Sequence, residues 1–448
     1  MNFKVRKISR KPKKGFIQKS LEYLKKNKKV CLALLVVLII GGGVFSLQQM
    51  HPFHPVKHIL NLSPLKADKN GHTNILVLGV GGFAQEGGNL SDSLMIVSIS
   101  QKEKSLSLLS IPRDLFVASR VGERKLNEVY ASAKFKYGDQ KGLAIAKDAI
   151  SNITKLDIHY AAVIDFKLFA ELVDLIGGVE IFVPKAINDP FYPAPNYQYQ
   201  TFTIRQGLQT LDGETALKYA RSRKTSSDYA RAQRQQDLLL AIKTKVEKQG
   251  LLSNLGKLSN LYKLVKERVN TDLSLTEIGI IAKHVQGLEY KNVVSSVLND
   301  DPAHKGGILY TPAKDLYGGQ FVLLPRDQVE LEEFFKLAIR NPEIWKENAQ
   351  ISVLNGSKET GKANKLSKKL RQLGFHVIET GNFESDKALL KHRIRSLSQR
   401  TPKTTEFLTS FLHIQPTKTP SQLDSSTTPN ENESGILDLE IILGTDPI

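Results

Sequence analysis

Short apolar runs alternate with stretches of helical spacing through the first folded part of the chain. The runs are apolar throughout or alternate with polar residues, which is typical of buried strands. Strands that alternate with helices favour an α/β fold in which helices flank a layered central β-sheet. The predicted strands are NILVLGV (74–80), LMIVSIS (94–100), SLSLLSIP (105–112), HYAAVIDF (159–166) and VEIFVP (179–184), and the predicted helices are GLAIAKDAISNIT (142–154) and KLFAELVDLIGG (167–178).

The same patterns divide the rest of the chain into a helical extension of this domain and a second, small domain. The first domain covers 73–247, and helical spacing dominates its extension, 248–345, in segments 255–267, 274–288 and 327–339. From residue 349, the strand AQISVLNGS, the amphipathic helix GKANKLSKKLRQLGF and the strand HVIETGN predict a small α/β domain over 349–446.

Residues 415–436 have the composition of a flexible loop, yet the apolar segment DLEIILG follows them. A run this short is unstable in water without a paired strand. We therefore expect DLEIILG to pair in the same sheet as ISVLNGS.

Residues 30–47 are a mostly apolar segment of eighteen residues without a charge, which as a helix spans about 27 Å, close to the thickness of the bilayer's hydrocarbon core. Residues 1–29 carry twelve Lys and Arg and one acid, which places the N-terminus in the cytoplasm by the positive-inside rule. The pattern predicts a basic cytoplasmic tail, a single N-terminal transmembrane helix, a linker over 48–72 and an extracytoplasmic remainder in the cell membrane. A cleaved signal peptide is the alternative.

The net charge of +18 by itself would suggest a nucleic-acid partner, but +11 of it belongs to residues 1–29. The rest of the chain carries a modest charge and shows no recognition-helix or aromatic-platform pattern, so we expect no nucleic acid as partner. The single cysteine, Cys31, lies inside the apolar segment, which excludes a disulfide framework and a catalytic thiol.

Arginines gather at 221–234, directly before an amphipathic helix. On a helical wheel of 228–246, Asp228 and Gln235 share the stripe of the apolar residues Leu239, Ile242 and Val246, and Arg231 lies at its edge. Polar groups on a core-facing stripe need partners, so this end of the helix is expected to line a polar cavity. Arg221 and Arg223 lie two positions apart, on one side of the chain if it is extended there. A surface charge cluster is the alternative.

Two further motifs place polar residues at the ends of predicted strands. SIPRDL (110–115) puts Arg113 and Asp114 at the carboxyl end of a strand, where open α/β sheets bind ligands, and GGNLSDS (87–93) delivers Asp92 at the start of another. Several guanidinium groups, a few carboxylates and no Ser-His-Asp or cysteine nucleophile suit phosphoryl chemistry. In that chemistry arginines neutralise phosphate charge and Mg²⁺ bridges phosphate oxygens.

The order of these motifs resembles the LytR-CpsA-Psr family of cell-envelope proteins, once called transcriptional attenuators. The resemblance runs from about Asn74 to Val246, and the segment from ISVLNGS to DLEIILGTD is similar to the small C-terminal domain that often accompanies it. It implies a membrane-anchored phosphotransferase, usually with Mg²⁺, that transfers a glycopolymer from a polyprenyl-pyrophosphate carrier to peptidoglycan. The motifs that carry it are NILVLGV, SDSLMIVSIS, LSLLSIPRDLFV, KLNEVYA, VDLIGGVEI, LDGETALKYARSR and D-x-x-R-x-x-x-Q.

The resemblance also implies roles for individual residues. Asp92 matches a metal-binding aspartate, and Arg113 matches the arginine of the IPRD motif, which binds pyrophosphate. Arg221 and Arg223 match the R-x-R pair, also on pyrophosphate. The helix that completes the site contributes Asp228, a candidate base, together with Arg231 and Gln235; the expected catalytic residues are Arg113, Asp228 and Arg231.

This sequence departs from the family pattern at the metal site. Gly81 and Gly82 stand where the family has its first metal-binding aspartate, and Leu90-Ser91 replaces the usual arginine before Asp92. Asp92 is then expected to hold Mg²⁺ with phosphate oxygens and water, or with Asp189 as a second ligand.

Four hypotheses remain open at the level of sequence. The leading one is the transferase, with an apolar channel near Ala161–Ile176 for the lipid. The others are a pyrophosphatase that acts on the carrier without an acceptor, a non-catalytic scaffold that binds lipid or glycopolymer, and a transcriptional attenuator. The predicted topology disfavours the last of these.

Overall fold

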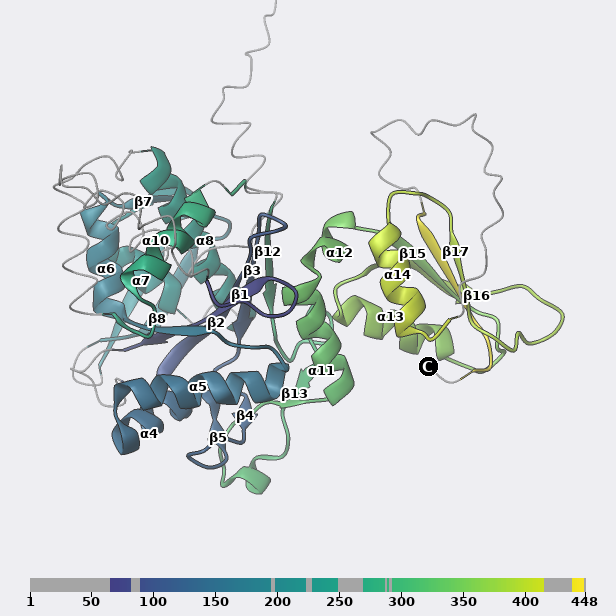
Figure 1. The fold of residues 1–448 in the computed structure, drawn as a ribbon, viewed down its shortest axis with the longest axis horizontal. Helices are drawn as coiled ribbons and strands as arrows, with labels where there is room; N and C mark the ends of the chain where they lie inside the picture. Colours follow the sequence, from purple (N-terminus) through teal and green to yellow (C-terminus); the bar gives the residue numbers. More distant parts are fainter. Residues whose placement is uncertain are drawn as a thin grey trace, which may run out of the picture.

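The structure is a computed structural model that describes residues 65–81, 89–194, 198–222, 228–248, 269–286, 288–289, 292–414 and 437–446. A large α/β domain is built on one six-stranded sheet, and a small α/β domain follows it. Helices α11 (Gln328–Phe335) and α12 (Pro342–Glu347) lie between the two (Figure 1). The predicted α/β class, with a central sheet flanked by helices, is confirmed.

The six strands of the central sheet lie in the order β11-β6-β1-β2-β3-β12. β1 pairs in parallel with β6 and antiparallel with β2, and β3 pairs antiparallel with β2 and in parallel with β12. Four strands, β1, β3, β6 and β12, therefore end at one edge of the sheet, where β2 begins. The strands are β1 (His72–Val80), β2 (Ser91–Ser100), β3 (Ser105–Ile111), β6 (Tyr160–Asp165), β11 (Asn270–Thr271) and β12 (Val293–Val297).

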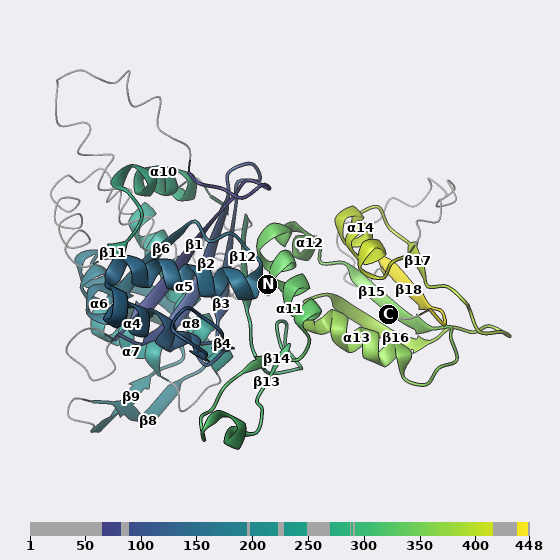
Figure 2. The same ribbon diagram turned by 60° about the horizontal axis from the view of Figure 1, so that its bottom comes forward.

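Alternate residues of these strands face two separate hydrophobic cores. In β1, Ile75 and Val77 lie in one core and Leu76 and Leu78 in the other, as the two-residue period of a strand requires. Because both faces are buried, the strands read as nearly continuous apolar runs. Helices α6, α7, α8 and α10 cover the first core, and α4, α5, α11 and the π-helix η4 cover the second (Figures 1 and 2). Their bounds are α4 (Leu126–Tyr137), α5 (Asp139–Thr154), α6 (Phe166–Leu175), α7 (Gly213–Arg221), α8 (Asp228–Lys248), α10 (Leu275–Gln286) and η4 (Lys336–Arg340).

The segment that follows α8 differs from the helical extension that its sequence pattern indicates. Besides α10 and α11, it supplies two strands of the central sheet, because β11 pairs with β6 and β12 pairs with β3. β11 has only two residues and β12 reads VVSSV, so neither gives a long apolar run. Ser274 and Glu277 form a capping box before α10, as Ser274 at a helix start suggests. The predicted helix 255–267 lies outside the described residues.

Smaller antiparallel pairs extend the large domain beyond its sheet. The pair that matters for the site is β8 (Ile187–Pro193) with β9 (Tyr199–Ile204), which projects from the domain as a two-stranded ribbon (Figure 2). The others are β4 (Phe116–Val117) with β5 (Arg124–Lys125), β7 (Val179–Val183) with β10 (Gly207–Leu211), and β13 (Leu309–Tyr310) with β14 (Leu324–Pro325), with a short 3₁₀ helix η3 (Lys314–Tyr317) between the last two.

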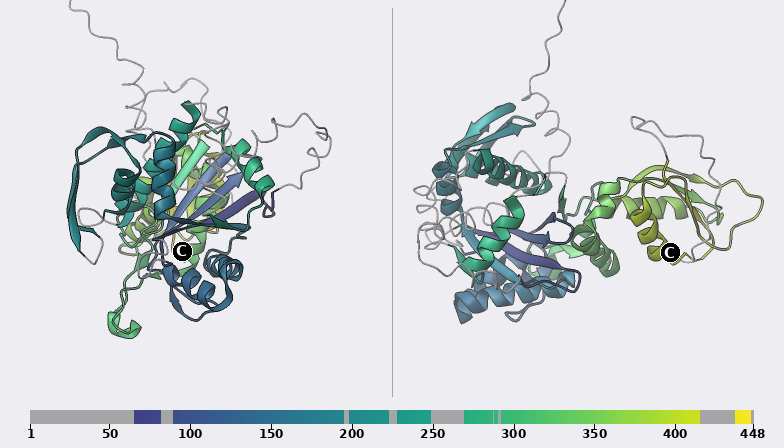
Figure 3. Two further views of the ribbon diagram at one scale, coloured as in Figure 1. Left: turned by 90° about the vertical axis from the view of Figure 1, so that its left-hand side faces the viewer. Right: turned by 45° about the horizontal axis from the view of Figure 1, so that its top comes forward.

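The small domain stands beside the large one, with α11 and α12 between them (Figure 3). Its sheet has the order β16-β15-β18-β17, so the last strand of the chain is internal. Ile351 of β15 lies opposite Leu439 of β18, which confirms the predicted pairing of ISVLNGS with DLEIILG. The predicted loop 415–436 lies outside the described residues. The elements are β15 (Gln350–Asn355), α13 (Lys362–Gln372), β16 (His376–Asn382), β17 (Arg393–Ser396), α14 (Pro402–Phe411) and β18 (Leu439–Leu443).

The predicted cytoplasmic tail, the predicted transmembrane helix 30–47 and most of the linker 48–72 lie outside the described residues. Among the helices of the described ranges, none is both long enough and apolar enough to cross a bilayer.

Candidate functional site

Five of the predicted site residues meet at the edge where β1, β3 and β6 end and β2 begins. Asp92, Arg221, Arg231 and Gln235 line one cavity of about 320 Å³. Arg113, which follows β3 after Pro112, reaches Asp92 with its guanidinium group. Residues that are more than a hundred positions apart in the sequence therefore converge, as we expected from the strand ends.

Arg113 lies between two carboxylates. Its Nη1 is 2.5 Å from Oδ1 of Asp92, and its Nε is 3.4 Å from Oδ2 of Asp114. Asp114 is buried and is also paired with Nζ of Lys125 at 3.2 Å, so it holds the guanidinium from the protein side. Asp92 is more exposed and borders the cavity, so a ligand that reaches Asp92 also comes close to Arg113.

Helix α7 fixes the position of Arg221. The helix begins after Asp212, whose Oδ1 accepts a hydrogen bond from the Thr215 N–H at 2.8 Å. Gly213 lets its first turn approach α6, because a Cβ at this position would lie 2.0 Å from the Ala170 carbonyl oxygen. Arg221 is the last residue of α7, where a positive charge complements the helix dipole.

The guanidinium of Arg221 lies beside two aromatic rings. Its central carbon is 4.7 Å from the ring centre of Phe166 and 6.0 Å from that of Tyr192. Burial raises the pKa of the Tyr192 phenol, although the charge of Arg221 and a hydrogen bond from it act in the opposite direction. Tyr192 therefore stays neutral at physiological pH and does not cancel the charge of Arg221, which remains available to an anion.

Helix α8 satisfies the carbonyl groups at the end of α7. Arg234 donates from Nε to the Tyr219 carbonyl at 2.9 Å and from Nη2 to the Ser222 carbonyl. Gln235 donates to the Ala220 carbonyl at 3.3 Å and accepts a hydrogen bond from the Ser93 hydroxyl at 3.0 Å. The last carbonyls of a helix have no partner within the helix, so these contacts hold the backbone on both sides of Arg221.

The helical wheel of α8 was correct for most of its core-facing stripe but missed two buried polar residues. Arg231, Leu239, Ile242 and Val246 are buried as predicted. Arg234 and Gln236 are buried too, although the stripe does not include them. Gln236 donates to the Ser110 hydroxyl of β3 at 3.1 Å, and Arg234 packs beside the ring of Tyr219. The sequence did contain a sign that polar residues of α8 are buried. Residues 231–236 read RAQRQQ, and so many polar residues in succession cannot all lie on one stripe of a helix.

We predict that Arg234→Ala lowers the free energy of unfolding by about 1.5–3 kcal/mol, the usual worth of hydrogen bonds to a charged group. It should also weaken the binding of inorganic pyrophosphate, because the end of α7 loses its support. Urea unfolding and calorimetric titration measure the two effects. Arg234→Lys should recover only part of each, since an ammonium cannot span two carbonyls as a planar guanidinium does. Pyrophosphate affinity that stays unchanged in Arg234→Ala would contradict the positioning role.

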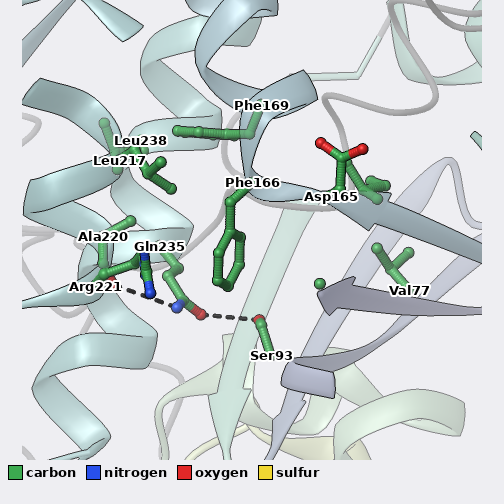
Figure 4. A pocket seen from close by; sticks show the side chains of 12 residues that line it. Val77, Ser93, Asp165, Phe166, Phe169, Leu217, Ala220, Arg221, Gln235 and Leu238 are labelled. Carbon is green, nitrogen blue, oxygen red and sulfur yellow. Dashed lines mark hydrogen bonds between the residues drawn. The ribbon is translucent and has the colours of Figure 1, made fainter. Parts of the chain in front are cut away.

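A second, apolar pocket adjoins the polar cavity. It holds about 30 Å³ and is lined by side chains of β1, α6, α7 and α8, with Phe166 at its centre and Arg221, Gln235 and Ser93 at one side (Figure 4). Phe166, Arg221 and Gln235 line both spaces, so they mark the boundary between them. The apolar pocket includes Ile164 and Phe169, within the segment where the sequence indicates a lipid channel.

Two predicted site residues, Arg223 and Asp228, cannot be placed in the site, and neither can Gly82, one of the two glycines at the departure from the family pattern. Arg223 and Gly82 lie outside the described residues, and the side chain of Asp228, the first residue of α8, is not described either. Gly81 directly follows β1, whose last residue, Val80, is paired with Ser91 next to Asp92. Within the described ranges no three His, Cys, Asp or Glu side chains come close enough together to hold a metal ion.

Two parts of the chain match known families. Residues 46–317 match the LytR_cpsA_psr family, and residues 348–446 match the family described as LytR cell envelope-related transcriptional attenuator. The first match alone covers more than half of the chain.

Individual relatives are more distant in sequence. The cell wall biosynthesis protein LcpA of Corynebacterium glutamicum is 27% identical over 331 residues, which are 65% of this chain and 60% of LcpA. The polyisoprenyl-teichoic acid–peptidoglycan teichoic acid transferase TagU of Bacillus licheniformis is 24% identical over 310 residues, 66% of this chain and 94% of TagU. The crystal structure of Bacillus subtilis TagV aligns with 61% of this chain and 98% of TagV, at 22% identity and a TM-score of 0.46. The chain thus spans three fifths of LcpA and nearly all of TagU.

Proposed function

Because the chain belongs to the LytR-CpsA-Psr family, we propose that it is a phosphotransferase of cell-envelope biogenesis, which transfers a glycopolymer from a polyprenyl-pyrophosphate carrier to peptidoglycan. One observation carries the proposal: a cavity lined by Arg221 and Arg231 shares a boundary with an apolar pocket. A polyprenyl pyrophosphate has the same two parts, an apolar chain joined to a polyanion. The names of TagU and LcpA, a transferase and a cell-wall protein, agree with this assignment.

In the proposed reaction an acceptor hydroxyl of peptidoglycan attacks the phosphorus that bears the glycopolymer. A P–O bond forms to the acceptor while the P–O bond to the bridging oxygen breaks, and polyprenyl phosphate leaves with the electron pair. Arg113, Arg221 and Arg231 would bind the phosphate oxygens and stabilise the charge that develops on them. The acceptor proton passes to a base, for which Asp228 at the start of α8 is our candidate.

Mg²⁺ is the proposed cofactor, and when bound it would neutralise charge on the pyrophosphate oxygens. Asp92 fits the role of its protein ligand, because it borders the cavity and contacts Arg113 through only one carboxylate oxygen. Asp189 fits less well: its Oδ1 accepts from the Phe191 N–H at 3.1 Å and its Oδ2 from the Ser222 hydroxyl at 2.7 Å. Mg²⁺ commonly binds through one or two carboxylates plus phosphate and water, so Asp92 alone is sufficient.

The carrier lipid sets a further requirement. The apolar pocket has room for only about one or two water molecules, so a prenyl chain would enter only if α6 moved away from α7 and α8. The proposal also includes a single-pass anchor at 30–47 with the site outside the cell membrane, which brings the site within reach of lipid-linked substrate. A reporter fused to the C-terminus should be active only on the outer side, and activity confined to the cytoplasm would reject this topology.

Reconstitution of the full chain in vesicles tests the function. The vesicles contain a polyprenyl-pyrophosphate-linked glycan and Mg²⁺, and peptidoglycan is added outside. We expect release of polyprenyl phosphate together with glycan bound to peptidoglycan, both dependent on the acceptor. Release of polyprenyl phosphate at the same rate without peptidoglycan would indicate a pyrophosphatase instead. Tight binding of the glycolipid without any turnover would indicate a scaffold.

A further inference from the structure

The β8–β9 ribbon presents two exposed aromatic side chains to the site cavity. Phe191 is 52% exposed and Tyr199 67% exposed, whereas Tyr192 and Phe202 of the same ribbon are buried. The exposed rings lie edge to face, with their centres 5.9 Å apart and an interplanar angle of 84°. Both line the same cavity as Arg221 and Arg231. Exposed aromatic surface beside an anion-binding group is a feature of ligand sites rather than of ordinary protein surface.

A β-bulge places Phe191 at the cavity. The register of β8 against β9 shifts between Asp189 and Tyr192, so Pro190 and Phe191 together stand opposite the single residue Thr201 of β9. A bulge beside a binding site changes the direction of the side chain that it carries. Because of the bulge, Tyr192 is buried while its neighbour Phe191 faces the cavity. Tyr199, which lies opposite Pro193 in the partner strand, faces the cavity as well. Regular alternation along β8 would not produce this arrangement.

The aromatic pair is held in a fixed relation to the arginines. Asp189, which is buried, accepts hydrogen bonds from the Phe191 N–H in the bulge and from the hydroxyl of Ser222. Ser222 directly follows Arg221 and binds Arg234 through its carbonyl. On the inner side of the ribbon, Tyr192 packs against Phe202 with ring centres 5.9 Å apart. The bulge and the end of α7 are therefore linked directly through Asp189 and Ser222.

The two pockets give a bound substrate a direction. The apolar pocket lies on one side of the boundary formed by Phe166, Arg221 and Gln235, and the polar cavity with the aromatic pair lies on the other. A pyrophosphate at that boundary with its prenyl chain in the apolar pocket points its other end toward Phe191 and Tyr199. That end bears a sugar, one phosphoester linkage away from the arginines.

We propose that Phe191 and Tyr199 form a binding subsite for the sugar that is linked directly to the pyrophosphate of the carrier. The inference rests on the proposed function, because it takes the lipid and the anion to occupy the sites assigned to them above. A pyranose ring has one face of C–H groups, which packs against the electron-rich face of an aromatic ring, while its hydroxyls remain in water. Half-exposed rings suit this ligand, since they cover one face of the sugar and leave the rest open to the following units of the polymer.

The test compares three probes on the full chain in detergent: farnesyl pyrophosphate, and two derivatives of it that carry one glucose or one N-acetylglucosamine. Of the two glycosylated probes, the one with the higher affinity should bind roughly three to ten times more tightly than farnesyl pyrophosphate, the worth of one aromatic packing contact. Phe191→Ala and Tyr199→Ala should remove this advantage and leave the dissociation constant of farnesyl pyrophosphate unchanged. Tyr199→Phe should keep most of it, because the ring and not the hydroxyl makes the contact.

Controls separate this inference from the function on which it rests. Phe135→Ala removes an aromatic ring that is even more exposed, from α4 on the other face of the sheet, and should change neither affinity. Melting temperatures should stay close to that of the parent chain, since both side chains are largely exposed. If farnesyl pyrophosphate itself does not bind, the proposed function fails. If farnesyl pyrophosphate binds but the sugar adds no affinity, the function stands and the sugar subsite is rejected. The same holds if Phe191→Ala weakens the binding of all probes equally, and that result would assign the rings to the prenyl chain.

Discussion

Replacing Arg221 with alanine is expected to lower the rate of glycan transfer by about 10²–10³-fold, the usual cost of removing one donor that stabilises a transition-state charge. Arg221 lines both pockets, and the neutral phenol of Tyr192 beside it does not cancel its charge. Release of polyprenyl phosphate from the reconstituted vesicles measures the loss. Arg221→Lys should stay close to the alanine variant, since an ammonium lacks the planar two-point contact with phosphate and does not stack on Phe166 in the same way.

The same substitution should leave the free protein as stable as before, or slightly more stable. Arg221 lines the same cavity as Arg231, and removing one of these like charges relieves repulsion that offsets the lost interactions with the helix dipole and the Phe166 ring. Pyrophosphate should raise the melting temperature of the parent chain by mass action on the folded state, and this shift should be small or absent in Arg221→Ala. Arg205→Ala, at an exposed position outside both pockets, is the matched control. A sharp fall in the ligand-free melting temperature of Arg221→Ala, with no ligand shift in the parent, would identify the arginines as a structural ion-pair network.

The sequence predicted an element of the fold most reliably where the buried residues of that element form a regular pattern by themselves. The strands of the central sheet are buried on both faces, so their apolar runs identify them without knowledge of their neighbours. β18 could be predicted beyond 415–436 for the same reason, because Leu439, Ile441 and Leu443 are buried on one face and Ile442 on the other. The strand-end motif around Arg113 followed from the rule that ligands bind where parallel strands end.

The parts that could not be predicted depend on contacts between distant elements. Arg234 reads as one more surface arginine until α8 is seen to lie against the end of α7. The ribbon that carries Phe191 contains prolines and polar residues, so it has no strand signal, and its bulge depends on pairing with a segment several residues away. β11 is too short and β12 too polar to be recognised as a strand from the sequence. They become strands because they pair with the two edges of the central sheet.

Asp92→Asn is expected to raise the Mg²⁺ concentration needed for half-maximal transfer by about 100-fold or more, because even groups that only support a metal ligand usually cost 10–100-fold in affinity. Of the two described carboxylates that line the cavity, Asp92 has the fewer contacts to protein groups, since Asp189 accepts hydrogen bonds from the ribbon and from Ser222 through both of its oxygens. Titration of the transfer rate with Mg²⁺ measures the shift. Asp189→Asn is the control: it should weaken the glycosylated probe by disturbing the ribbon, but it should leave the Mg²⁺ requirement unchanged.

The departure from the family pattern at Gly81 allows the converse experiment. Gly81 directly follows Val80, which is paired with Ser91, the residue before Asp92, so a side chain there would lie at the same edge of the sheet as Asp92. We predict that Gly81→Asp lowers the required Mg²⁺ concentration by roughly tenfold, since a second carboxylate near a divalent ion contributes on the order of 1–4 kcal/mol at the dielectric of a protein surface. Gly81→Asn has nearly the same size without the charge and should have little effect. If Asp92→Asn and Gly81→Asp both slow the reaction and leave its Mg²⁺ dependence unaltered, Asp92 acts only by holding Arg113, and the metal binds through phosphate oxygens alone.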